Sequence, residues 1–287
     1  MLIPASQISS FNGTDIIKTY EDIQNNEKNF EELFLIHQNF TFEENLVRLV
    51  EKTNNIVPNG SKLQVTDLMK DIILDAPKRA ISFTISRDFK TLEKILINNL
   101  KKYEGYIKVA SLIEDPKTRG VVIEGFITGE KRVIDSFCKN KDDQNTFLTE
   151  VKSENGLGDY EKSFDQFLTK TDVKTKVLYD KSNPKAYNID KFLEFMSNDK
   201  SVFMFFFVGL KPKEYNNNEN ISIENALINV FQVEILKNTR IQYHWSGRNS
   251  RGVTQLNGEV IKTLLLVPKN NINEIESRDF LIKLMEL

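Results

Sequence analysis

The chain has 287 residues, of which 40% are hydrophobic and 28% charged, so it can bury a real core and is not a disordered chain. Its formal net charge of −2 excludes a basic character of the whole chain, so a nucleic-acid role would depend on local cationic patches. One cysteine, Cys138, stands beside only two histidines, His37 and His244, which excludes an internal disulfide and a Cys/His zinc site within one chain.

Targeting signals and membrane segments are not predicted. The N-terminal residues lack the charged and apolar regions of a signal peptide. The longest apolar run, residues 202–210, is less than half of the roughly 20 residues that a membrane helix needs. We therefore expect a cytoplasmic protein without a membrane partner.

The first part of the chain, residues 1–140, is predicted to be an α+β region that serves recognition, dimerisation or both. Hydrophobic periodicity and turn residues indicate its elements. They are polar helices within 15–75, a strand at 78–86, an amphipathic helix at 87–103, and strands at 105–113 and 120–128.

The polar stretch 138–145 predicts a boundary, and residues 141–287 are predicted to form a second domain. Its predicted elements are a short helix at 147–155, a hairpin at 163–178, a helix at 187–199, a strand at 201–210, strands at 229–236 and 240–245, and a final helix at 277–287. The strand at 201–210 is apolar on both faces, which is typical of the middle of a sheet covered on both sides.

The hairpin, SFDQFLTKTDVKTKVL, carries an unusual set of charges. If Thr169 and Lys170 form a two-residue turn, Asp165 pairs opposite Lys174, and both lie on one face with Asp172. Asp165 and Asp172 then become diagonal neighbours about 7–8 Å apart at the backbone. Two carboxylates on one patch repel unless a cation lies between them.

A hard divalent cation such as Mg²⁺ satisfies such a pair of carboxylates. Lys174 beside it can orient or deprotonate a water, or stabilise negative charge on a phosphate. This pattern favours metal-dependent hydrolysis of a phosphodiester. The residues leave one alternative open, a solvated strand face with cross-strand ion pairs.

The same segment resembles the signature of the PD-(D/E)XK nucleases, the fold of most type II restriction endonucleases. In that family a first Asp precedes an acid-x-Lys strand within an α-β-β-β-α-β core. Asp165 matches the first acid, and Asp172-Val173-Lys174 matches D-x-K, while the helix and strand at 187–210 match the elements that follow. No proline precedes Asp165, and Asp159 is the alternative first acid.

The resemblance covers about residues 145–255 and implies an α/β (α+β) fold with a mixed central sheet flanked by helices. It also implies that Asp165 and Asp172 hold Mg²⁺, with help from the Val173 carbonyl, and that Lys174 activates the water. The family often adds an acid from the preceding helix, for which Glu150 and Glu154 are the candidates.

The stretch 240–258 combines cationic and amide side chains with glycines. Arginine pairs with guanine, and asparagine or glutamine with adenine, at the major-groove edge. The candidate DNA-binding residues are Arg240, His244, Arg248, Asn249, Arg251 and Gln255. An ordinary polar surface turn is the alternative.

Together these features predict a Mg²⁺-dependent, sequence-specific endonuclease of double-stranded DNA, of the type II restriction kind. Recognition of a palindromic site implies a homodimer, because a two-fold site is bound by a two-fold protein. Two other functions stay open. One is a structure-selective repair or junction nuclease with the same core, and the other is a non-catalytic DNA-binding or interaction protein.

Overall fold

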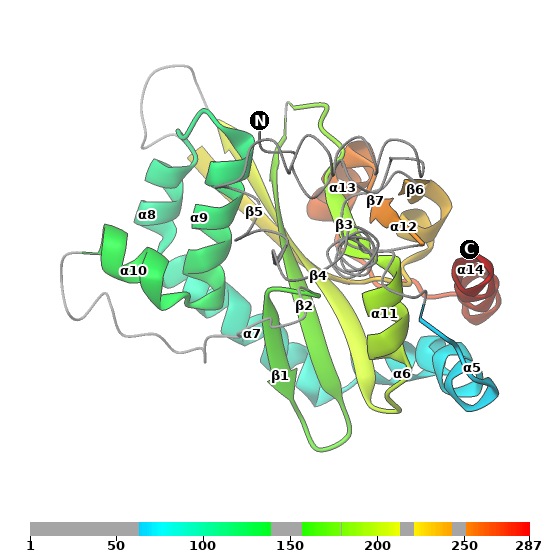
Figure 1. Ribbon diagram of the computed structural model, residues 1–287. Helices are drawn as coiled ribbons and strands as arrows, with labels where there is room; N and C mark the ends of the chain where they lie inside the picture. The colour runs from blue at the N-terminus through cyan, green and yellow to red at the C-terminus, as the bar shows by residue number, and fades with distance from the viewer. Residues whose placement is uncertain (1–62, 139–156, 179, 213–220, 243–250) are drawn as a thin grey trace, which may run out of the picture. The chain divides into compact units, whose positions relative to one another are not determined.

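The computed structural model of the chain describes residues 63–138, 157–178, 180–212, 221–242 and 251–287. The chain divides into two compact units. The larger unit, Val65–Gln242 with Val253–Leu287, holds all of the helices and strands described below (Figure 1). Of the smaller unit, Met1–Gln64 with Tyr243–Gly252, only residues 63, 64, 251 and 252 are described.

A mixed sheet forms the centre of the larger unit. Its strands lie in the order β1 (Tyr160–Ser163), β2 (Leu168–Val177), β4 (Ser201–Pro212) and β5 (Ile221–Asn229). β1 and β5 run antiparallel to their neighbours, whereas β2 and β4 are parallel, with Asp172 beside Phe205. A small antiparallel sheet has the order β3 (Lys185–Asn188), β7 (Val253–Gln255) and β6 (Arg240–Gln242).

Helices flank the central sheet (Figure 1). Those described before it are α5 (Asp67–Leu74), α6 (Ala76–Thr84), α7 (Arg87–Lys102), α8 (Glu104–Ala110), α9 (Pro116–Thr128) and α10 (Lys131–Phe137). Those within and after it are α11 (Ile189–Met196), α12 (Val233–Asn238), α13 (Gly258–Leu266) and α14 (Glu274–Glu286). The predicted fold class, α+β with a mixed sheet between helices, is therefore confirmed. None of the helices in the described ranges is long and apolar enough to cross a membrane.

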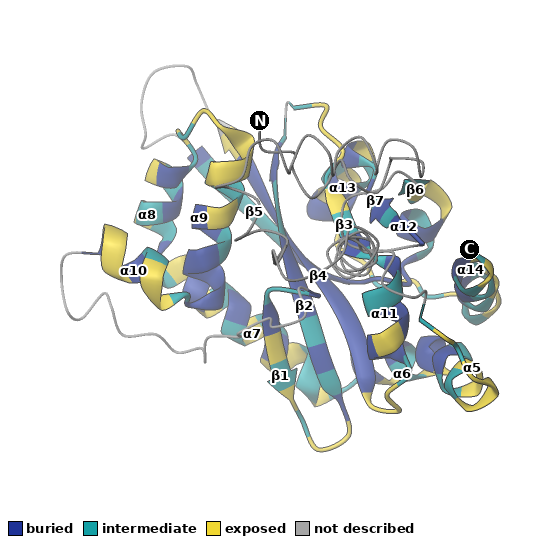
Figure 2. Cartoon of the chain, viewed as in Figure 1, coloured by how far each residue is buried: buried dark blue, intermediate teal, exposed yellow. Residues whose placement is uncertain are grey.

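β4 is buried on both faces, as predicted (Figure 2). Alternate side chains of a strand point to opposite faces. On one face, Val202, Met204, Phe206, Val208 and Leu210 join a hydrophobic core with residues of α6 to α10. On the other face, the rings of Phe203, Phe205 and Phe207 form a row that Tyr187 and Phe192 extend. The parallel pair β2–β4 therefore lies between two helical layers.

Three of the predicted strands are wrong, because residues 78–86, 105–113 and 120–128 fall largely in α6, α8 and α9. Their β-branched and aromatic side chains suit strands, but helix-start signals prevail. α9 begins at Pro116, and the side chain of Asp115 accepts a hydrogen bond from Thr118 N at 2.7 Å. A capping Asp followed by Pro at the first helical position is a strong helix start.

The outcomes for the other predicted elements within the described residues differ. The helices at 87–103, 187–199 and 277–287 are confirmed as α7, α11 and α14. The strand at 229–236 is wrong, because β5 ends at Asn229, where the side chain accepts a hydrogen bond from Phe231 N and turns the chain into α12. The strand at 240–245 is present as β6 over its first three residues, and the rest of it lies outside the described residues.

The predicted boundary at 138–145 lies, except for Cys138, in a range that the structure does not describe. One hydrophobic core nevertheless includes residues from both sides of it, such as Phe126 of α9 and Val173 of β2.

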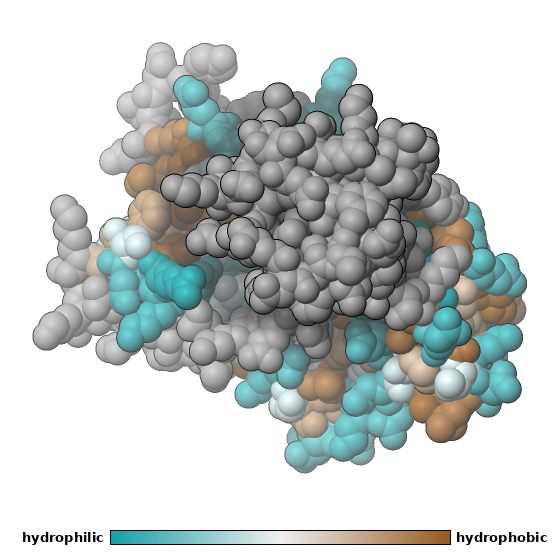
Figure 3. All heavy atoms as spheres, viewed as in Figure 1, coloured by the Kyte–Doolittle hydropathy of each residue, from teal (hydrophilic) through white to brown (hydrophobic). Residues whose placement is uncertain are grey.

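Exposed apolar side chains occur around α8 to α10, at Val109, Leu112, Val121 and Phe137. Figure 3 shows apolar and hydrophilic atoms side by side over this part of the face in view.

The start of α11 offers a test of local stability. The side chain of Asn188 accepts a hydrogen bond from Lys191 N at 3.0 Å and so caps the helix. We expect Asn188→Ala to lower the free energy of unfolding by about 1 kcal/mol, and Asn188→Asp, which keeps the acceptor, by a few tenths at most. Denaturant titration measures both values. Equal losses for the two variants would show that the cap is not the cause.

Candidate active site

The hairpin predicted at 163–178 is built differently from the prediction. Its turn lies at residues 164–167, and β2 continues without interruption from Leu168 to Val177. Tyr160 pairs with Thr171, and Ser163 with Leu168. The predicted turn at Thr169 and Lys170 is wrong, because both residues lie within the strand.

This register separates Asp165 from Asp172. Asp165 is exposed in the turn, where its backbone carbonyl accepts a hydrogen bond from the Lys200 side chain at 3.1 Å. Asp172 lies four residues beyond the start of β2, which is roughly 13 Å along a strand. The structure therefore does not bring together the two acids that the sequence analysis paired.

Asp172 and Lys174 do lie together. They are two residues apart on β2, so their side chains point to the same face of the sheet. Lys174 Nζ is 2.5 Å from Asp172 Oδ1, and the carboxylate side chain is only 4% exposed. Between them, Val173 points to the opposite face and packs into the core, as the sequence analysis expected.

Asp159 approaches the same strand from the start of β1. Its backbone N–H donates to the carbonyl of Thr171 at 2.8 Å, and its carboxylate accepts a hydrogen bond from Val173 N at 2.7 Å. A side-chain oxygen thus satisfies a backbone donor just past the last pair between β1 and β2. Gly158 before it has φ of 73°, a left-handed conformation that glycine adopts without strain.

A third carboxyl group comes from Glu124 on α9, the helix that packs against β2. Its side chain is hydrogen-bonded to that of Asp159. Burial, followed by the negative charge of Asp159, raises the pKa of Glu124 to about 8, while Lys174 opposes this shift. Glu124, Asp159, Asp172 and Lys174 therefore form one cluster of four ionisable groups, which we call the acidic cluster.

The charge state of the acidic cluster follows from its burial. Burial raises the pKa of Asp172 well above its ordinary value, and the neighbouring Asp159 adds to this shift, whereas Lys174 opposes it. Burial alone would lower the pKa of Lys174, but the carboxyl groups of Asp172 and Asp159 outweigh it and the net shift is upward. Three carboxyl groups beside one ammonium leave an excess of negative charge that protons or a cation must neutralise.

The donors of the acidic cluster are carboxylate oxygens, the ligands that hard divalent cations such as Mg²⁺ prefer. Within the described ranges, no group of three His, Cys, Asp or Glu side chains is already arranged to hold a metal ion. The ammonium of Lys174 lies against the Asp172 oxygen that a cation would approach. The residues thus fit Mg²⁺ in donor type and charge, and its binding requires Lys174 to give up part of its contact with Asp172.

The remaining predicted site residues fall in several places. Glu150, Glu154, His244, Arg248 and Asn249 lie outside the described residues.

Arg240 and Gln255 form a cross-strand pair of the small sheet, between β6 and β7. The amide of Gln255 accepts a hydrogen bond from Gln242 and donates one to the Asn183 carbonyl. Arg251, in the smaller unit, is buried, and its guanidinium donates to the carbonyl of Leu63 at 3.1 Å.

Glu124 is not among the predicted site residues, because the sequence predicts a strand at 120–128. The signal that could have found it is the pair Asp115-Pro116, which marks the start of a helix. Asp159 is the alternative first acid in the sequence, and the structure places Asp159, not Asp165, beside Asp172 and Lys174.

No protein-family model matches the chain, and no curated protein sequence matches it. An assignment of function therefore depends on the chain's own residues and on their arrangement.

Proposed function

We propose that the chain is a Mg²⁺-dependent deoxyribonuclease of the type II restriction kind, which hydrolyses phosphodiester bonds of double-stranded DNA. The observation that carries the proposal is the acidic cluster, in which α9, the start of β1 and β2 each supply a carboxyl group beside Lys174. Buried titratable groups with strongly shifted pKa values and a specific charge partner are typical of functional sites.

The order of the elements supports the same proposal. The chain runs from Asp159, directly before β1, to β2, which carries Asp172-Val173-Lys174, and then through β3 of the small sheet and α11 to β4. A strand, an acid-x-Lys strand, a helix and a strand are the last four elements of the α-β-β-β-α-β core of the PD-(D/E)XK nucleases. Asp159 takes the place of Asp165 as the first acid in this proposal.

Each member of the acidic cluster has a distinct task in hydrolysis. When bound, Mg²⁺ supplies Lewis acidity toward the phosphate oxygens. Asp159 and Asp172 would hold it, because the two carboxyl groups are neighbours beside β2. The Lys174 ammonium orients the attacking water and stabilises negative charge on the phosphate. With a pKa of about 8, Glu124 holds a proton at neutral pH and can exchange it with the site.

Recognition of the DNA sequence is assigned to Arg240 and Gln255, the predicted DNA-binding residues that lie on the small sheet. A pair of chains would bind a palindromic site.

Digestion of a sequenced supercoiled plasmid tests the proposed function. We expect discrete linear fragments with Mg²⁺ and intact plasmid with a chelator, because the acidic cluster needs a cation to face a phosphate. Fragment ends, determined by sequencing, give the recognition site. Smeared or structure-dependent products would indicate the repair or junction nuclease, and binding without any cleavage would show that the protein is not a nuclease.

A further inference from the structure

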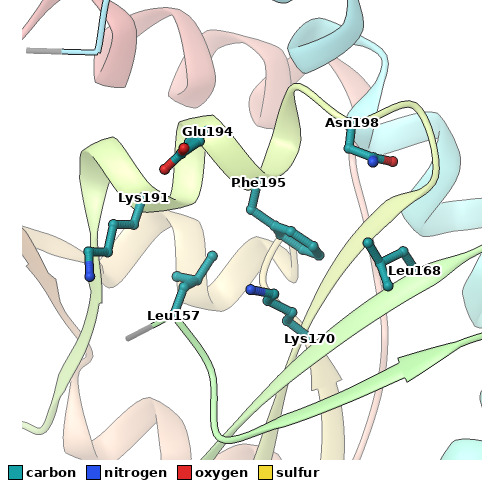
Figure 4. Close-up of a pocket in the computed structure, with 7 residues that line it drawn as sticks. All are labelled: Leu157, Leu168, Lys170, Lys191, Glu194, Phe195 and Asn198. Carbon is teal, nitrogen blue, oxygen red and sulfur yellow. The ribbon is translucent and has the colours of Figure 1, made fainter. Parts of the chain in front are cut away.

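A pocket of about 220 Å³ lies between β2, the segment before β1 and α11 (Figure 4). Its lining residues are Leu157, Leu168, Lys170, Lys191, Glu194, Phe195 and Asn198. Phe195 points from α11 toward Lys170 of β2, and Leu157 lies between Lys170 and Lys191 in this view. We call this cavity the Phe195 pocket.

The Phe195 pocket adjoins the acidic cluster through two chain segments. Lys170 precedes Asp172 by two residues on β2, so both side chains lie on the same face about 7 Å apart at the backbone. Leu157 precedes Asp159 by two residues in the segment before β1. The backbone joins the two segments, because Asp159 N donates to Thr171 O. A substrate held at the acidic cluster therefore has its neighbouring nucleotide at the pocket.

The lining has the character of a base-binding site. Leu157, Leu168 and Phe195 supply apolar walls with one aromatic ring, whereas Asn198 and Glu194 supply hydrogen-bonding groups at the margin. The two lysines of the lining suit a phosphate, but a site for a phosphate alone would not need three apolar side chains, which suit the faces of a base. The volume is below the roughly 300 Å³ at which sites for drug-sized ligands begin, so it suits a single planar group.

Lys170 is positioned to respond to such a ligand. Its ammonium lies 5.2 Å from the centre of the Phe195 ring and 3.5 Å from Glu161 Oε2. The contact with the ring shows that the aromatic face accepts a partner. A base that stacks on Phe195 displaces the ammonium, which can then pair with the phosphate of the same nucleotide.

We propose that the Phe195 pocket binds the unstacked nucleobase of the nucleotide next to the phosphate held at the acidic cluster. This inference rests on the proposed function. It narrows the substrate to a strand in which one base leaves the stack, either single-stranded DNA or a duplex from which the base is flipped out.

The test uses the full-length chain with Asp172→Asn, which blocks cleavage, and fluorescently labelled single-stranded oligonucleotides in which one abasic position is moved along the strand. We expect one abasic position to weaken binding roughly tenfold, the size of one base stacked on an aromatic ring. Glu194→Trp, at an exposed lining position of α11, should fill the pocket. It should weaken binding of the intact strand by a similar factor and make all abasic positions equal.

Asp279→Trp is the matched control, because it also replaces an exposed acid on a helix, α14, by tryptophan. It should behave like its parent, and thermal melting confirms that both tryptophan variants fold. If the abasic position keeps its effect in Glu194→Trp, or if no position has an effect, the pocket does not bind a base. The same abasic series in duplex DNA extends the test to a flipped base. If the unchanged chain cleaves duplex and no abasic position has an effect in single strands or in duplex, the pocket is overturned while the proposed function stands. Absence of both binding and cleavage would overturn the two together.

Discussion

Asp172→Asn is expected to reduce Mg²⁺-dependent cleavage by at least roughly 10²–10³-fold while DNA binding survives. The amide has the shape of the carboxyl group but cannot carry the negative charge that a cation requires. The amide removes the charged partner of the Lys174 ammonium, so thermal melting is used to check that the variant folds. Single-turnover rates on plasmid, with binding measured in chelator, separate the loss of chemistry from a loss of affinity.

Two further acids make this experiment decisive. Asp159→Asn should lose cleavage to a similar extent, because Asp159 shares the acidic cluster with Asp172. Asp165→Asn is the matched control, since Asp165 is exposed in the turn before β2, and it should cut at the rate of the unchanged chain. Loss of cleavage in Asp165→Asn with full cleavage in Asp159→Asn would contradict the site described above.

The central strands could be predicted because the pattern of apolar side chains along each strand indicates its surroundings. β4 is apolar on both faces, so only the middle of a covered sheet can bury it. The D-x-K strand was found because Asp172 and Lys174 alternate with apolar Val173. Its register was not found, because Thr169 and Lys170 were assigned to a turn although Thr169 and Thr171 are buried strand residues.

The helices before the sheet could not be recognised from periodicity alone. The second half of α9, from Val122 onward, is buried on most of its sides, so its apolar residues are nearly continuous and show no stripe of period 3.6. A short continuous apolar run can be a buried strand or a buried helix. With a strand predicted in place of α9, Glu124 could not be recognised as a site residue, because its contact with Asp159 depends on the tertiary packing of α9 against β2.

The second large effect that we expect concerns Glu124, whose titration should make the free energy of unfolding depend on pH. A carboxyl group whose pKa is raised on folding binds more protons in the folded chain than in the unfolded chain between the two values. Its contribution to stability is therefore fully present below the ordinary pKa and is lost as the pH rises through the folded value. For Glu124 this window runs from 4.5 to about 8.

In chelator, Glu124→Gln should therefore be more stable than the unchanged chain at about pH 8.5, and the difference should shrink toward pH 5. The change across this window is on the order of a few kcal/mol. The charged neighbours that shift the pKa of Glu124 are Asp159 and Glu130, which raise it, and Lys174, which lowers it. All three remain in the variant, so the comparison isolates the group at position 124. Urea titrations at a series of pH values measure the difference, and Asp71→Asn, at an exposed position of α5, is the acid-to-amide control.

Mg²⁺ binding should depend on the protonation of Glu124. A cation bound at the acidic cluster would compete with the proton on Glu124, so its binding should be weaker at low pH than at high pH. We expect Mg²⁺ to raise the melting temperature of the unchanged chain more at about pH 8.5 than at about pH 6. In Glu124→Gln this dependence on pH should become weaker, because one of the protons that oppose the cation is gone. A Mg²⁺ effect that is the same at both pH values in both proteins would show that Glu124 and the cation do not share a site.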